Sequence, residues 1–142
     1  MLTVRTILHE KGNAVFHVSP NATVLDALRE MAERDCGALI VLEDGCPIGV
    51  LSERDYARKV VLMGRLSKDT LVREIMDENV VRVPTTLSVQ ECMLLMTEYR
   101  TRHLLAHDGE HIAGVVSIGD VVKAVISDQQ FTITQLEKYI TG

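Results

Sequence analysis

A short motif of a glycine, a serine and an aspartate occurs twice in the chain at the same internal spacing. The first copy is GVLSERD (Gly49–Asp55), and the second is GVVSIGD (Gly114–Asp120), 65 residues later. A serine at the start of a helix lies beside unpaired backbone N–H groups at the positive end of the helix dipole, which suits a phosphate. A carboxylate three residues later accepts hydrogen bonds from the vicinal hydroxyls of a ribose. The pattern therefore predicts a site for a nucleoside phosphate.

The same residues have a second interpretation, which is purely structural. A serine followed three residues later by an acid is an ordinary helix cap that stabilises a helix by about 1 kcal/mol. The glycine before it permits the close approach of a second backbone or of a flat ring. One copy alone indicates a cap. Two copies, each at the end of an apolar run, favour a binding site.

The elements that position these residues form an internal repeat. Residues 18–55 align without a gap with residues 83–120, and nine of these 38 positions are identical. Each copy predicts a short strand, an amphipathic helix with apolar residues at i, i+3, i+4 and i+7, two strands joined by a polar turn, and a second helix. The expected fold is α/β, built from two β-α-β-β-α repeats.

The domain boundaries follow from the repeat. We expect a first repeat with an N-terminal segment over 1–64, a linker over 65–71, a second repeat over 72–127 and a helical tail over 128–142. The helix after the second motif is expected to end near Ser127. A separate last helix follows it, and its docking on the body or on a second subunit stays open.

Composition limits the class of protein. The 142 residues are 46% hydrophobic, so a core can form, and the net charge of −5 argues against nucleic-acid binding through a general basic surface. No apolar run approaches the roughly 20 residues of a membrane span, and no signal peptide is visible. Three cysteines without a CxxC pair indicate reduced thiols. We therefore expect a soluble, cytoplasmic protein without a membrane or nucleic-acid partner.

The whole chain resembles a tandem pair of CBS domains, which are named after cystathionine β-synthase, and such a pair is called a Bateman module. The resemblance is carried by the two G-h-h-S-x-x-D motifs (h, hydrophobic), the β-α-β-β-α order and the TRHLL stretch. SERDYARKVVL, VREIM and QLEKYITG resemble bacterial free-standing CBS-pair proteins. The resemblance implies that the repeats pack around a pseudo-twofold axis with two clefts, and that two such modules associate as a disc-like homodimer.

The resemblance also implies ligands and residues. The clefts of the family bind adenosyl compounds such as AMP, ADP, ATP, NAD(H) or S-adenosylmethionine. Carried over by position, Asp55 and Asp120 would hold ribose, and Ser52 and Ser117 would approach phosphate. The remaining expected ligand-binding positions are Gly37, Ala38, Val50 and Arg54 in the first copy and Arg102, His103, Val115 and Gly119 in the second.

The two copies of the motif differ, which predicts clefts with unequal ligands. Arg54 precedes the aspartate in the first copy, and Gly119 stands there in the second. The first cleft therefore suits more phosphate charge. The second leaves more room, with Arg102 or His103 as its source of charge. Asp77, where the family often has threonine, disfavours a nearby phosphate.

Other constellations carry less weight. His103, His107 and His111 have the spacing of a metal-binding helix face, but Asp108-Gly109 between them predicts a hairpin, so no metal site is expected. Neither a catalytic triad, nor paired catalytic carboxylates, nor a phosphate loop is visible, so we expect no enzyme and no catalytic cofactor.

The expected function is that of a regulatory sensor of adenine nucleotides, which acts on a separate effector protein. The alternative is a ligand-independent dimerisation or scaffold module, in which both motifs are only helix caps.

Overall fold

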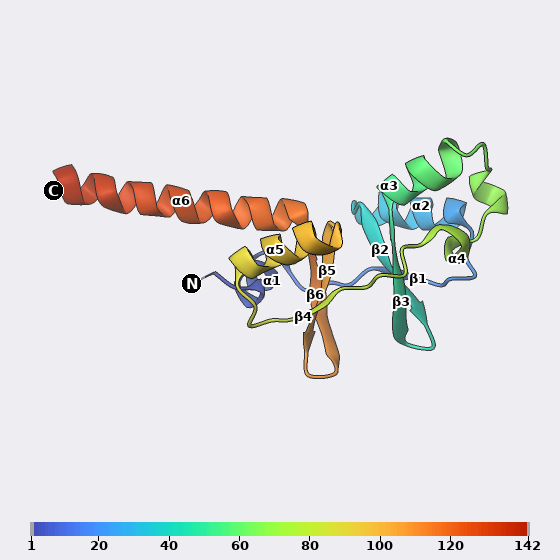
Figure 1. Cartoon of the computed structure of the whole chain (residues 1–142), viewed down its shortest axis with the longest axis horizontal. Helices are drawn as coiled ribbons and strands as arrows, with labels where there is room; N and C mark the ends of the chain where they lie inside the picture. Colours follow the sequence, from blue (N-terminus) through green and yellow to red (C-terminus); the bar gives the residue numbers. More distant parts are fainter. Residues whose placement is uncertain (1, 142) are drawn as a thin grey trace. The chain divides into compact units, whose positions relative to one another are not determined.

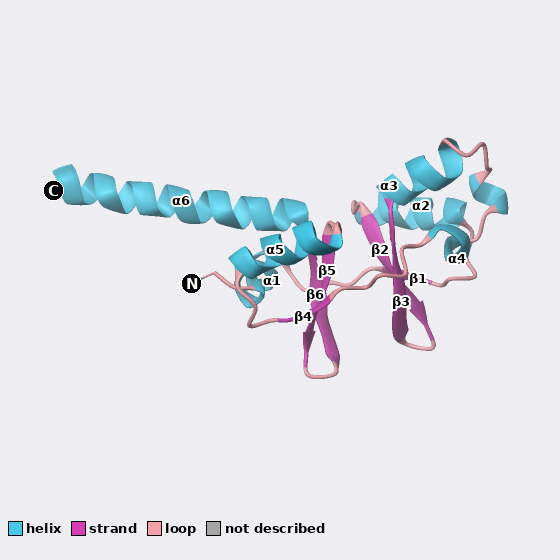
Figure 2. Cartoon of the chain, viewed as in Figure 1, coloured by secondary structure: helices cyan, strands magenta, loops and turns pink. Residues whose placement is uncertain are grey.

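The computed structural model describes residues 2–141 and divides the chain into two compact units (Figures 1 and 2). The continuous unit is Val15–Val80. The composite unit joins the N-terminal segment up to Ala14 to the chain from Val81 onward.

The continuous unit contains a three-stranded sheet with the order β1-β2-β3, in which β1 runs parallel to β2 and β2 antiparallel to β3. Its elements are β1 (His17–Val18), α2 (Val24–Arg34), β2 (Ala38–Glu43), β3 (Cys46–Ser52), α3 (Glu53–Tyr56) with a π-helical turn (Ala57–Val61), a 3₁₀ turn (Ser67–Asp69) and α4 (Val72–Ile75).

The composite unit repeats this arrangement with the order β4-β5-β6. Its elements are α1 (Val4–Lys11), β4 (Arg82–Pro84), α5 (Val89–Tyr99), β5 (His103–Asp108), β6 (His111–Ser117) and α6 (Ile118–Thr141). Even the irregularity in the strand pairing recurs, between Val41 and Leu42 in one sheet and between Ala106 and His107 in the other. The predicted α/β fold of two β-α-β-β-α repeats is confirmed.

The repeats and the compact units divide the chain differently. The helix α1 belongs to the composite unit, because Val4 N–H donates to Leu87 O at 2.9 Å and Val89 N–H donates to Leu2 O at 3.0 Å. In the same way α4, which precedes the second repeat in sequence, belongs to the continuous unit. There Val72 N–H donates to Ala22 O at 2.9 Å. Each unit thus receives its entry helix from the segment that precedes the other repeat.

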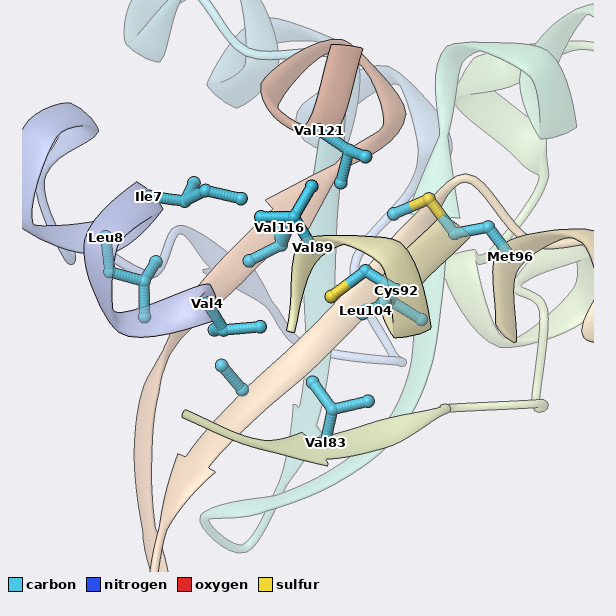
Figure 3. Packing of buried hydrophobic residues seen from close by; sticks show 11 residues of the cluster. Val4, Ile7, Leu8, Val83, Val89, Cys92, Met96, Leu104, Val116 and Val121 are labelled. Carbon is cyan, nitrogen blue, oxygen red and sulfur yellow. The ribbon is translucent and has the colours of Figure 1, made fainter. Parts of the chain in front are cut away.

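The core of the composite unit lies between its sheet, α1, α5 and the first turn of α6 (Figure 3). The predicted periodicity is confirmed at Val89, Cys92 and Met96 of α5, which are buried, whereas Met93 is 44% exposed. Facing them are Val4, Ile7, Leu8, Val83, Leu104, Ala106, Val116 and Val121. Aliphatic and sulfur-containing side chains therefore make up this cluster.

The helix after the second motif does not end near Ser127, and that expectation is wrong. The single helix α6 continues to Thr141, because its sequence from Asp120 onward contains neither glycine nor proline. Three threonines along it donate their hydroxyls to carbonyls one turn back, Thr132 to Asp128 O at 3.1 Å, Thr134 to Gln130 O at 3.0 Å and Thr141 to Glu137 O at 2.7 Å. None of the described helices, α6 included, is long and apolar enough to cross a bilayer.

Candidate functional site

The first motif lies where β3 ends and α3 begins, a point that we call the Ser52 junction. Ser52 is the N-cap of α3. Its N–H and its hydroxyl both donate to Asp55 Oδ2 at 2.9 Å, and Asp55 N–H donates to Ser52 Oγ at 3.2 Å. The serine and the aspartate therefore close a reciprocal capping box.

The second motif lies where β6 meets α6, and we call this point the Ser117 junction. Ser117 N–H donates to Asp120 Oδ2 at 2.8 Å, and Asp120 N–H donates to Ser117 Oγ at 3.2 Å. The two junctions share this geometry, and in both the carboxylate is held on the rim of the helix start. The structural interpretation of the motif, a helix cap, is thus confirmed for both copies.

Each carboxylate also forms an ion pair with a lysine, but the two lysines come from different elements. Lys59 reaches Asp55 from the same helical segment, with Nζ 3.3 Å from Oδ1, and it also donates to Ile75 O at 2.9 Å. Lys11 reaches Asp120 from α1, with Nζ 2.7 Å from Oδ2, and it also donates to Val115 O at 2.9 Å. A cation beside the carboxylate is therefore a shared feature that the two halves achieve in different ways.

The electrostatics of Asp120 follow from these contacts. Burial disfavours the charged carboxylate, but the hydrogen bonds from Lys11 and Ser117 and the lysine charge outweigh it, so the pKa of Asp120 lies below its ordinary value. Asp120 is consequently ionised at neutral pH and available as a hydrogen-bond acceptor.

The neighbouring predicted residues also gather at these junctions. In the continuous unit Ala38 pairs with Ser52, and Gly37 O accepts a hydrogen bond from Glu53 N–H at 3.0 Å. In the composite unit His103 pairs with Ser117, and Arg102 O accepts from Ile118 N–H at 2.9 Å. The start of each middle strand is therefore fixed beside the start of each helix by the register of the sheet.

Arg54 and Gly119 occupy equivalent positions in the first turns of α3 and α6. Arg54 is half-buried, and Gly119 is exposed. A Cβ atom added at Gly119 would lie 3.7 Å from Ser117 Oγ, which is an ordinary contact. The absence of a side chain at Gly119 is therefore not required by packing, unlike at the first glycine of the motif.

The first glycine of each motif has a structural explanation. A Cβ at Gly49 would lie 2.8 Å from Met76 Sδ and 3.1 Å from Asp77 O, and a Cβ at Gly114 would lie 2.6 Å from Leu8 Cδ2. At Gly49 the segment that follows α4 crosses the strand, whereas at Gly114 a leucine side chain of α1 itself packs on the strand. The expected close approach of a second backbone is confirmed at Gly49, whereas a side chain takes its place at Gly114.

The valines after these glycines have different hydrogen-bond partners in the two units. Val50 and Asp77 exchange two backbone hydrogen bonds of 2.9 Å, whereas Val115 O accepts from the side chain of Lys11. The Asp77 carboxylate accepts from Asn79 N–H at 2.9 Å. This contrast arises because α1 continues as a helix to Lys11, while α4 ends at Ile75 and the chain then runs extended.

Lys11 is the residue of the Ser117 junction that the sequence analysis missed. It lies within the few extra residues that follow VRTIL (Val4–Leu8) and have no match after VREIM (Val72–Met76). This local difference between the copies is the only signal in the sequence for the role of Lys11. It points to Asp120 only once α1 is known to pack on the second repeat.

The three histidines lie on a hairpin, as expected. His103 and His107 belong to β5 and His111 to β6, and Asp108 pairs with His111. Within residues 2–141, no group of three or more histidine, cysteine or acidic side chains is placed to hold a metal ion.

Comparison with known proteins identifies the repeats. The CBS domain model matches residues 3–62 and 72–127. The chain is 35% identical over 149 residues to the mitochondrial CBS domain-containing protein CBSX3 of Arabidopsis thaliana, with 99% of this chain and 72% of that protein covered.

Solved structures agree with this match. A protein with CBS domains from Burkholderia ambifaria is 51% identical, with a TM-score of 0.85 and coverage of 92% of this chain and 98% of that chain. A hexameric CBS-CP12 protein from bloom-forming cyanobacteria is 29% identical, with a TM-score of 0.77 and coverage of 85% and 70%. The chain therefore belongs to the CBS domain family and carries two CBS domains in tandem.

Proposed function

We propose that this pair of CBS domains senses adenine nucleotides by binding AMP, ADP, ATP or NAD(H) at the Ser52 and Ser117 junctions. Pairs of CBS domains are regulatory and signal-transduction modules rather than catalytic ones. We propose in addition that the signal is an adenine nucleotide.

One observation carries the proposal: a serine, a carboxylate and a lysine lie together at the start of a helix, twice. The lysine Nζ is 3.3 Å from Asp55 in one copy and 2.7 Å from Asp120 in the other. A ribose diol takes the carboxylate as its acceptor, and the lysine released from it turns to the phosphate. The helix start adds its dipole to the phosphate side.

The two junctions offer different surroundings to a nucleotide. The Ser52 junction has Arg54 in the first turn, and the Ser117 junction has the open position of Gly119 with Lys11 from α1 as its cation. Lys11 supplies a positive charge at this junction beside the charge expected from Arg102 or His103. We infer that the Ser52 junction favours more phosphate charge and the Ser117 junction a bulkier adenosyl ligand.

The regulatory output is thermodynamic. A nucleotide stabilises the conformation that binds it by RT ln(1 + [L]/Kd), about 2.7 kcal/mol at a hundredfold excess over Kd. An effector protein or a second copy of the chain responds only when it distinguishes the bound and free states.

The competing function is a ligand-independent scaffold, and the reciprocal capping boxes at both junctions favour it. In that case the serines and aspartates only terminate strands and start helices. The two functions differ in one respect, because a cap contributes to stability whether or not a nucleotide is present.

Thermal unfolding with AMP, ADP, ATP, NAD, NADH and S-adenosylmethionine separates the two. We expect at least one compound to raise the melting temperature of the wild type, and Asp55→Asn with Asp120→Asn to abolish the increase. The matched control is Ser88→Ala, which removes the capping hydroxyl of another capping box in the composite unit, on α5. It should lower the melting temperature without changing the response. No response to any compound would leave the scaffold as the function.

A further inference from the structure

From Ile126 onward α6 has an apolar face that the described residues of its own unit leave largely exposed. Figure 1 shows α6 extending well past the other elements of the composite unit. Along it Ile126 is 59%, Ile133 48%, Leu136 56% and Ile140 79% exposed. An isolated helix of about 15 residues is marginal in water, so this segment needs a partner for its stability.

The spacing of these residues identifies the kind of partner. With Val122 at the start, the face alternates steps of four and three residues, which is the heptad repeat of a helix that packs against another helix. The stripe consists of Val122, Ile126, Gln129, Ile133, Leu136 and Ile140. It spans about 27 Å at 1.5 Å per residue.

We propose that α6 pairs antiparallel with the α6 of a second copy of this chain, about a twofold axis that crosses the apolar face midway between Gln129 and Ile133. In an antiparallel pair of helices, each core position a of one heptad repeat lies opposite a core position d of the other. Val122 then faces Ile140 of the second copy, and Ile126 faces its Leu136. Every position of the stripe finds its counterpart, so the face is complementary to itself without any shift.

Charge selects the antiparallel direction. Lys123 and Glu137 flank the stripe on the same side. Antiparallel pairing brings Lys123 of each copy beside Glu137 of the other copy. Within one helix they are about 21 Å apart and cannot meet. Parallel pairing would instead place Thr132 beside Glu137 and Val125 beside Gln130, which gives no charge pair.

The first test is the mass of the full-length protein in solution, measured by sedimentation velocity or light scattering. Ile133→Asp with Leu136→Asp should halve the number of 15.8 kDa chains per particle relative to the wild type. The matched control is Phe131→Asp, which lies on the opposite side of the same helix and is 64% exposed. An unchanged mass in the double variant, or an equal loss in the control, would overturn the proposal.

Charge reversal tests the direction and does not depend on disrupting the stripe. Lys123→Glu and Glu137→Lys should each weaken self-association by roughly five- to tenfold, because symmetry creates two like-charge contacts per pair of helices. The combined variant should return to wild-type association. A combined variant at least as weak as either single variant would exclude antiparallel pairing. Far-UV circular dichroism confirms in each case that the body of the protein stays folded.

Discussion

Replacing Lys11 with methionine isolates the contact that joins α1 to the Ser117 junction. Methionine keeps the apolar stem but removes the Nζ atom, which lies 2.7 Å from Asp120 Oδ2 and 2.9 Å from Val115 O. The two side chains of the ion pair are 37% and 20% exposed. A charge-assisted hydrogen bond in such partly buried surroundings contributes about 1 to 2 kcal/mol. We expect Lys11→Met to lower the melting temperature by about 3 to 6 °C.

The same contact predicts a pH dependence with a definite sign. The pKa of Asp120 is lower in the folded protein than its ordinary value of about 3.9. The stabilisation is therefore fully present above that ordinary value and is lost as the pH falls through the native pKa. Lys11→Met should consequently lose less stability than the wild type between pH 5 and pH 2, and the two curves should converge at acid pH.

The assay is urea unfolding at a series of pH values, together with a double-mutant cycle between Lys11→Met and Asp120→Asn. The control is Lys59→Met, whose Nζ lies 3.3 Å from Asp55 with 46% of the side chain exposed, so a smaller loss of about 0.5 kcal/mol is expected. Additive losses in the cycle, or a pH profile of Lys11→Met parallel to that of the wild type, would refute the reasoning.

Three further predictions concern the core, a glycine and the cysteines. Leu104→Ala should destabilise the composite unit by about 2 to 5 kcal/mol in urea unfolding, because Leu104 is fully buried; a loss below 1 kcal/mol would contradict the packing. Gly49→Val should destabilise more than Gly37→Val in the same measurement, since a Cβ atom meets the chain at Asp77 only at Gly49; equal effects would argue against the crossing. In native protein a thiol reagent at pH 8 should modify exposed Cys46 and spare Cys92, whose pKa burial raises to about 11; rapid modification of both would show that the core opens.

The fold is predictable from the sequence because its signals are local and occur twice. The helix α2 buries Val24, Ala27 and Met31 at the predicted spacing, and the strands before and after each hairpin turn have their expected positions. The junction residues were also predictable. A serine with an acid three residues later specifies its own hydrogen bonds, whatever the rest of the chain does.

The features that escaped prediction depend on contacts distant in sequence. The docking of α1 on the second repeat depends on backbone hydrogen bonds such as the one from Val4 to Leu87, which no local pattern predicts. The role of Lys11 at Asp120 depends on that docking in turn. The continuity of α6 through Ser127 was missed for the opposite reason, since two local patterns were assigned to two helices although no breaking residue separates them.

Calorimetric titration measures directly whether the Ser52 and Ser117 junctions bind an adenine nucleotide. Wild-type protein is titrated with AMP, ATP and NAD in parallel with Asp55→Asn and Asp120→Asn, in which asparagine keeps a capping oxygen but loses the charge. We expect saturable heat for the wild type with at least one ligand, and the loss of a different part of that binding in each variant. Saturable binding that persists unchanged in the two variants combined, or no binding heat with any of these ligands, would contradict this expectation.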